Sequence, residues 1–308
     1  MKYISIANTE LKTSNIIMGN MRLPQLNLQE AEKLIRTALE EGINFFDHAD
    51  IYGRGQSEEI FSNAIQMTPI IRENMIIQSK CGIRVPEGYF DFSKDHILRS
   101  VDGILDRLKT DYLDILLLHR PDPLMKPEEV AEAFEQLHTA GKVKYFGVSN
   151  FNPAQIELLQ KSIPYKLVVN QLQFSIAHTP MIDSGIALNM NVDQSINRDS
   201  SILEYCRLHD ITIQAWSPFQ HGFFEGVFLG DLKRYPELNK TLDTLAEKYG
   251  VSTTAIAVAW ITRHPANIQV VLGTTNSERL KEGCKGSEIK LTREEWYQLY
   301  KAAGNMVP

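Results

Sequence analysis

The sequence has few cysteines and no long apolar segment. Its three cysteines, Cys81, Cys206 and Cys284, stand far apart in 308 residues and form neither a disulfide framework nor a CxxC metal motif. Unpaired thiols of this kind are typical of a reducing compartment. No stretch approaches the roughly 18 apolar residues of a membrane helix, and the first residues lack the apolar core of a signal peptide. We therefore expect a cytoplasmic protein.

The sequence also lacks a block of positive charge. Its formal net charge is −6, and its lysines and arginines are scattered. This excludes a basic surface for nucleic acid and argues against stable association with an anionic membrane. The 43% hydrophobic content is ordinary for a globular protein, so we expect a small molecule as the partner.

No linker rich in glycine, proline or serine interrupts the chain, so we expect residues 1–308 to form one domain. Eight apolar segments of strand length recur along it, and an amphipathic segment of helical length follows each of them. The predicted strands are 16–18, 44–46, 75–79, 114–118, 145–148, 167–170, 212–215 and 268–272. The predicted helices are 28–41, 57–64, 95–108, 127–140, 153–160, 202–209, 238–249 with 253–264, and 276–282.

Eight strand–helix units in series predict a (β/α)8 TIM barrel of parallel strands, each buried on both faces. A doubly wound open sheet is the competing fold, but residues 16–23 hold one glycine where its dinucleotide-binding turn needs several. Residues 1–13 predict a short hairpin that closes the barrel floor. Residues 172–200 form one of the long loops expected at the C-terminal barrel face. Its apolar residues predict a structured wall rather than disorder: Phe174, Ile176, Met181, Ile182 and Leu188.

Ionisable side chains stand where consecutive predicted strands end. Asp47 follows the second strand, with Tyr52 five residues later, while Lys80 follows the third strand and His119 the fourth. Active sites of such barrels lie at the C-terminal strand ends, and neighbouring parallel strands are about 4.8 Å apart. The four side chains can therefore converge on one point.

Each residue also has an ordinary structural interpretation. Asp47 could cap the next helix, a single lysine after a strand is usually solvated, and a single histidine is usually a structural residue. We interpret His48 and Asp50 in this way, as hydrogen-bonding loop residues. The combination of aspartate, tyrosine, lysine and histidine is much less expected by chance than any one member.

Motifs along nearly the whole chain carry a family resemblance. They are GINFFDHADIYG (42–53), IIQSKCG (76–82), LDILLLHRPD (113–122), GKVKYFGVSNF (141–151), VVNQ (168–171), QAWSP (214–218) and VLGTTNSERL (271–280). In this order they resemble the aldo-keto reductase family, and most of all a bacterial branch of predicted oxidoreductases. The resemblance implies an NADP-dependent oxidoreductase with a catalytic tetrad of Asp47, Tyr52, Lys80 and His119, and no metal.

Those residue types suit carbonyl reduction. A carbonyl that accepts hydride needs a positioned acid, and a free tyrosine, with a pKa of about 10, is a weak one. An ammonium group beside Tyr52 lowers its pKa, and Lys80 is expected to do so while Asp47 holds Lys80. His119 would orient the carbonyl oxygen.

The hydride must come from a cofactor, since no side chain donates one. The resemblance implies NADP(H), with NAD(H) as the other possibility. It assigns Ser149, Asn150 and Gln171 to the carboxamide, Trp216 to stacking on the nicotinamide and Arg279 to the 2′-phosphate. The full set that it implies is Gly19, Asn20, Met21, Asp47, Ser149, Asn150, Gln171, Trp216, Ser217, Pro218, Phe219, Gln220, Gly222, Gly273, Thr274, Thr275, Arg279 and Glu282.

Several of these positions have a local structural explanation as well. Asn152 is expected to cap the helix that follows Ser149 and Asn150, and Trp216 could pack in the core. Thr275 with Glu278 has the spacing of a capping box. The sequence departs from the family pattern at two positions, where Gly273 stands for a frequent lysine and Gly283 for an asparagine that contacts adenine.

Two other functions compete with the reductase. A metal-dependent barrel hydrolase would need a His-x-His pair at the first strand, which residues 16–21 lack. A cofactor-sensing regulatory subunit of a membrane channel would keep the barrel and the cofactor site with little turnover. Neither the physiological substrate nor the oligomeric state can be read from the sequence.

Overall fold

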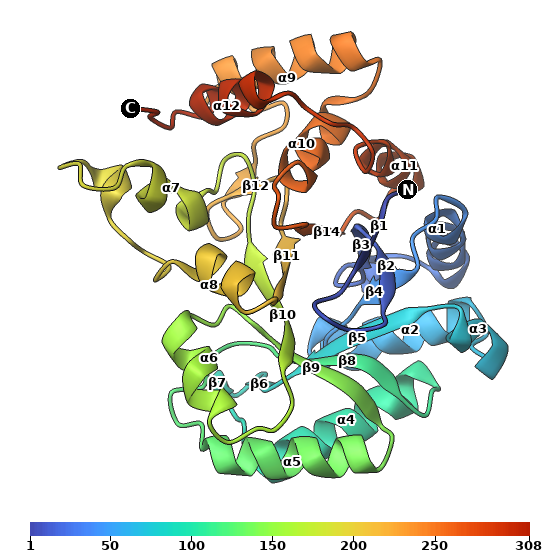
Figure 1. Ribbon diagram of the computed structural model, residues 1–308. Coiled ribbons are helices and arrows are strands. Elements are labelled where there is room, and N and C mark those ends of the chain that lie inside the picture. The colour runs from blue at the N-terminus through green and yellow to red at the C-terminus, as the bar shows by residue number, and fades with distance from the viewer.

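The computed structural model describes all 308 residues and contains a closed barrel of eight parallel strands (Figure 1). Each strand pairs with its neighbours in chain order, and the last pairs with the first, which confirms the predicted (β/α)8 fold. The barrel strands are β3 (Ile16–Gly19), β4 (Phe45–Asp47), β5 (Ile76–Cys81), β8 (Leu113–Leu118), β9 (Val143–Ser149), β10 (Leu167–Gln173), β11 (Thr212–Trp216) and β14 (Gln269–Leu272).

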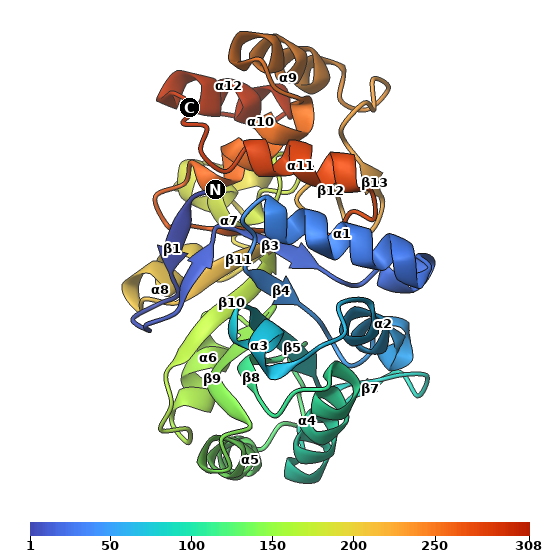
Figure 2. The same cartoon turned by 90° about the vertical axis from the view of Figure 1, so that its right-hand side faces the viewer.

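Helices surround this barrel, and in Figure 2 α11, α1, α2 and α4 follow one another along its outside. The helices between or after the barrel strands include α1 (Leu28–Glu40), α2 (Gln56–Ala64), α4 (Lys94–Leu108), α5 (Pro127–Thr139), α6 (Pro153–Gln160), α8 (Ile202–Leu208), α9 (Pro236–Tyr249), α10 (Thr253–Thr262) and α11 (Ser277–Lys285). Helix α1 illustrates why they form. It buries Ala31, Leu34, Ile35 and Ala38 at helical spacing, and a capping box begins it.

The strands alternate between two parts of the core. In β3, Ile16 and Met18 pack outward against the helices, whereas Ile17 packs inside the barrel. The N-terminal hairpin, β1 (Tyr3–Ser5) with β2 (Lys12–Ser14), completes the inner part. Ile6 in its turn is fully buried against Ile17 and the other inward side chains, as expected for a hairpin that closes the barrel floor.

Six of the eight predicted strands end earlier than the observed strands, including the two that carry Asp47 and Lys80. Asp47 is the last residue of β4, and Lys80 lies inside β5, paired in register with Leu117 of β8. The apolar pattern ends before Asp47 and Lys80, but the backbone pairing between neighbouring strands continues through both residues. Helices α3 (Pro69–Glu73) and α12 (Arg293–Ala302) were not predicted.

The segment 172–200 contains a helix, α7 (Pro180–Ile186), and a single turn at Asp193–Ser195. Of the five apolar residues on which the prediction rested, four are buried, but Leu188 is 77% exposed and does not contribute to packing. Its later part is held against α12, because the Tyr300 hydroxyl donates to Asp183 at 2.7 Å and accepts from Gln194 at 3.0 Å. The segment is therefore an ordered part of the fold.

Close packing between neighbouring barrel strands gives a first prediction. A Cβ at Gly147 in β9 would lie 2.7 Å from the Val169 carbonyl oxygen and 2.6 Å from the Leu117 side chain. We expect Gly147→Ala to lower the free energy of unfolding by about 1–3 kcal/mol. Gly185→Ala is the control, because a Cβ there meets no atom within 4 Å, and as a helical glycine it should leave stability unchanged or raise it by up to about 1 kcal/mol. Urea denaturation of both variants measures the difference, and equal stabilities would contradict the packing argument.

Candidate active site

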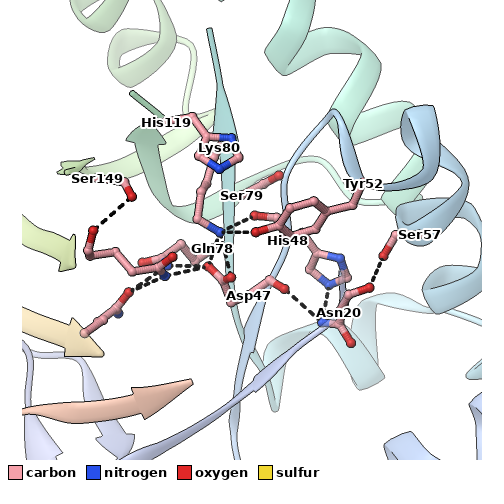
Figure 3. Close-up of polar contacts among 12 residues, drawn as sticks. Asn20, Asp47, His48, Tyr52, Ser57, Gln78, Ser79, Lys80, His119 and Ser149 are labelled. Atoms are coloured by element: carbon pink, nitrogen blue, oxygen red, sulfur yellow. Dashed lines mark hydrogen bonds and ion pairs between the residues drawn. The ribbon is translucent and has the colours of Figure 1, made fainter. Parts of the chain in front are cut away.

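The strand ends bring Asp47, Lys80, Tyr52 and His119 together at one edge of the barrel (Figure 3). Lys80 Nζ lies 2.6 Å from Asp47 Oδ2 and 3.2 Å from the Tyr52 hydroxyl. Tyr52 begins a short helical turn, Tyr52–Gly55, and the Tyr52 and His119 ring centroids are 6.0 Å apart. All four side chains of the expected tetrad therefore face one another.

Lys80 is a fully buried cation with four acceptors around its ammonium group. It donates to both carboxylate oxygens of Asp47, at 2.7 and 2.6 Å, to the His48 carbonyl oxygen at 2.9 Å, and to Tyr52. Burial alone lowers the pKa of Lys80, but Asp47 and then Tyr52 outweigh it, and the pKa lies above its ordinary value. Lys80 is therefore charged at neutral pH.

The pKa of Tyr52 differs from the sequence argument. Burial is the largest effect and raises the pKa of Tyr52 above 10, although Lys80 lowers it as expected and Asp47 raises it further. The phenol is therefore protonated at neutral pH. Burial is also the largest effect on His119, where together with Lys80 and Arg120 it holds the pKa well below 6.5, so the imidazole is neutral.

A chain of buried glutamines supports Asp47 from inside the barrel. Gln78 and Gln171 donate to Asp47 Oδ1 at 2.6 and 3.0 Å. Their amides also donate to Gln214, at 2.9 and 3.0 Å, and Gln214 donates to Gln269 at 3.1 Å. The Gln171 amide nitrogen is thus bonded to Asp47 and Gln214 in this structure. The sequence reasoning did not identify Gln78, Gln214 and Gln269 as site residues, although a polar residue inside an apolar strand could have marked each of them.

Asn20 was expected at the cofactor site, but its amide lies in the protein interior. The amide nitrogen is 3.1 Å from Nε2 of the buried His48, and it also donates to the Met18 and Asp47 carbonyl oxygens. Burial and then Lys80 lower the pKa of His48 to about 3, so the ring is neutral. Beside Asn20, Gly19 ends β3 and Met21 is 38% exposed.

The expected nicotinamide residues form a polar row along the ends of β9 and β11. The Trp216 indole donates to the Asn150 side-chain oxygen at 3.0 Å, and the Asn150 amide donates to Ser149 Oγ at 2.8 Å. Trp216 is a half-exposed strand-end ring rather than a core residue. Arg120, which the sequence reasoning missed, lies 5.8 Å from the Trp216 ring centroid and 5.6 Å from that of Phe223. Arg120 directly follows His119 in the sequence, and this position is the only feature that could have marked it as a site residue.

Two loops carry the remaining expected cofactor residues. Ser217, Pro218 and Phe219 lead from β11 into a small hairpin that contains Gln220, and Gly222 adopts a positive φ of 56° in its turn. Gly273, Thr274 and Thr275 connect β14 to α11, and Glu282 lies within that helix.

The start of α11 corrects one prediction. Asn276, not Thr275, caps the helix, because its side-chain oxygen accepts from the Arg279 amide at 3.0 Å. Thr274 Oγ1 instead accepts from the Asn276 amide at 3.2 Å. The side chain of Arg279 lies exposed in the first turn and makes no ion pair.

Comparison with known proteins identifies the family. The model of the aldo/keto reductase family matches residues 15–303, and the chain therefore belongs to this family. It is 37% identical to uncharacterized oxidoreductase YcsN of Bacillus subtilis, with 98% of both chains covered. It is 34% identical to a 6-dehydroglucose reductase of Agrobacterium fabrum, again with 98% of both covered.

A solved structure agrees with the fold. The aldo/keto reductase from Klebsiella pneumoniae, crystallised with NADP and acetate, superposes with a TM-score of 0.79 at 22% identity, covering 99% of this chain and 96% of that one. The family and its oxidoreductase members assign the protein to NAD(P)H-dependent carbonyl reduction. No helix is long and apolar enough to cross a membrane.

The buried pair predicts how the site responds to losing one partner. Lys80→Met would leave the Asp47 carboxylate buried without its cation, which should lower the free energy of unfolding by about 3–5 kcal/mol. The double variant Asp47→Asn/Lys80→Met removes the uncompensated charge and should recover part of this loss. Denaturant titration of wild type and both variants measures the effect. A double variant less stable than Lys80→Met would contradict it.

Proposed function

We propose that this protein reduces an aldehyde or ketone to an alcohol with NADPH as the hydride source and Tyr52 as the proton donor. The observation that carries the proposal is the hydroxyl of Tyr52 held 3.2 Å from the ammonium group of Lys80, which is itself fixed by the buried Asp47. Hydride on the carbonyl carbon and a proton on its oxygen together give the alcohol.

Each member of the tetrad has a distinct role in this proposal. Tyr52 is protonated at neutral pH, so it can donate a proton as the carbonyl oxygen gains negative charge. Lys80 stabilises the phenolate left behind, and Asp47 fixes the position of Lys80. The neutral ring of His119 can hydrogen-bond the carbonyl oxygen and orient it.

The nicotinamide supplies the hydride when it is bound. The residues of the barrel mouth suit such a group, since the polar side chains of Ser149 and Asn150 lie beside the partly exposed Trp216 ring. Arg279 has an unpaired guanidinium in the first turn of α11, where free amides also favour a phosphate. At Gly283 a Cβ would lie 2.7 Å from a terminal carbon of Leu272, so a side chain at this position would require Leu272 to shift.

An active enzyme explains the complete tetrad better than a cofactor-sensing channel subunit does. The relatives named above are both oxidoreductases. The substrate class is a small aldehyde or ketone, and the similarity to a 6-dehydroglucose reductase makes sugar aldehydes the first class to test.

Turnover of a carbonyl panel with NADPH, followed by nicotinamide absorbance, tests the proposal directly. The panel should include a generic aromatic aldehyde and 6-dehydroglucose. Wild type should consume NADPH with at least one of them. Tyr52→Phe keeps the ring but loses the proton, and should reduce the rate about 10²–10⁴-fold without loss of NADPH binding. A Tyr52→Phe enzyme within a few-fold of wild type would show that another group donates the proton.

Arg279 gives the corresponding prediction for cofactor choice. Arg279→Ala should weaken NADPH binding about ten- to a hundredfold and leave NADH binding almost unchanged, because only NADPH carries the 2′-phosphate. Fluorescence titration with both cofactors measures the two dissociation constants. Equal losses of affinity for both cofactors would indicate that Arg279 contacts the adenine or supports the fold. A wild-type preference for NADH would refute the NADPH proposal.

A further inference from the structure

A second polar cavity lies beside the tetrad but is not lined by any of its members. It has a volume of about 280 Å³ and opens between the turn after β4, the strand β6 (Ile83–Arg84) and α4. Its titratable lining residues are Asp50, Arg54, Arg84, Glu87, His96, Arg99 and Arg107, and Glu87 is paired with Arg84. Four arginines around one cavity stand out in a protein with a net charge of −6.

The four arginines differ in how far their charge is neutralised. Arg107 is 2.8 Å from the fully buried Glu58, and Arg84 has two longer ion pairs of 3.5 and 3.6 Å. Arg54 and Arg99 form no ion pair and no side-chain hydrogen bond. Two uncompensated guanidinium groups therefore border the cavity, one from the turn after β4 and the other from α4.

Asp50 lies in the same lining and has an unused hydrogen-bonding atom. Its Oδ1 is buried and has no partner. Burial first, and then Glu58, raise the pKa of Asp50 to about 7, while Arg107 opposes this shift. Near neutral pH a large fraction of Asp50 is thus protonated and can donate a hydrogen bond to an anion. The cavity therefore presents donors and positive charge together.

We propose that this cavity binds a phosphate-class oxyanion, either free phosphate or the phosphate group of a small metabolite, held by Arg54, Arg99 and Asp50. The planar guanidinium group matches phosphate oxygens with two parallel hydrogen bonds. The volume is near the lower end of ligand pockets, which suits a small phosphorylated compound. The site does not depend on the proposed reaction, since it is defined by binding alone.

Isothermal titration of the full chain with inorganic phosphate tests the proposal. Arg54→Gln/Arg99→Gln should weaken phosphate binding by about tenfold or more, because both lost groups are charged donors. Arg293→Gln, a change of another exposed arginine without an ion pair, is the matched control and should bind as wild type does. The proposal would be overturned if Arg54→Gln/Arg99→Gln bound phosphate as tightly as wild type does, or if wild type showed no saturable phosphate binding.

Two further variants make the result specific to this cavity. Asp50→Asn keeps a donor and removes negative charge, so it should bind phosphate more tightly than wild type, a gain that misfolding cannot imitate. Arg279→Gln separates this site from the proposed cofactor phosphate site and should leave binding in the cavity intact. Unchanged or weaker binding by Asp50→Asn, or loss of binding in Arg279→Gln alone, would place the anion elsewhere and refute the proposal.

A sugar phosphate titrated under the same conditions distinguishes the two sources of the anion. Tighter binding of the ester than of inorganic phosphate, lost again in Arg54→Gln/Arg99→Gln, identifies a metabolite site. Equal binding of both, with the same loss, identifies a site for the free ion. Binding of the ester that is insensitive to both arginines would contradict the assignment of the cavity.

Discussion

The organisation of the site depends on one buried ion pair, Asp47 with Lys80. Removing two charges from water costs several kcal/mol for each ion, and their attraction offsets this only when every remaining donor and acceptor is satisfied. Here the ammonium group has four acceptors, and Asp47 Oδ1 accepts from two glutamines as well as from Lys80. The Tyr52 hydroxyl is one of the four acceptors that share the three N–H groups of Lys80, so fixing Lys80 also places the ammonium group beside the proposed acid.

The glutamine chain connects this pair to the opposite end of the barrel. Gln214 donates to Gln269, which in turn donates to Thr13 Oγ1 at 3.0 Å and to the Ser14 carbonyl oxygen at 2.8 Å. A continuous hydrogen-bonded path therefore runs from Asp47 to β2 of the floor hairpin. The path links the orientation of Asp47 to the hairpin through direct hydrogen bonds, and within it the Gln78 side-chain oxygen is buried without a partner.

The sequence predicted the barrel and the convergence of four residues because both follow from local patterns. Apolar runs mark strands, and a polar residue that ends such a run marks the catalytic edge. The glutamine network could not be predicted, because it depends on which side chains face inward from four different strands. The helix cap at Asn276 and the exposure of Leu188 were missed for a similar reason, since competing turn donors and tertiary packing decide them.

The end of β4 and the turn that follows it place three polar side chains in three different surroundings. Asp47 faces the barrel interior and holds Lys80, His48 packs outward against Asn20 and Phe61, and Asp50 faces the arginine-lined cavity. The backbone amide of Asp50 donates to the Lys80 carbonyl oxygen at 3.0 Å, so this turn is fixed to β5. Asp47, His48 and Asp50 are therefore more than the polar residues that any surface loop would contain. Each has its own partner or cavity.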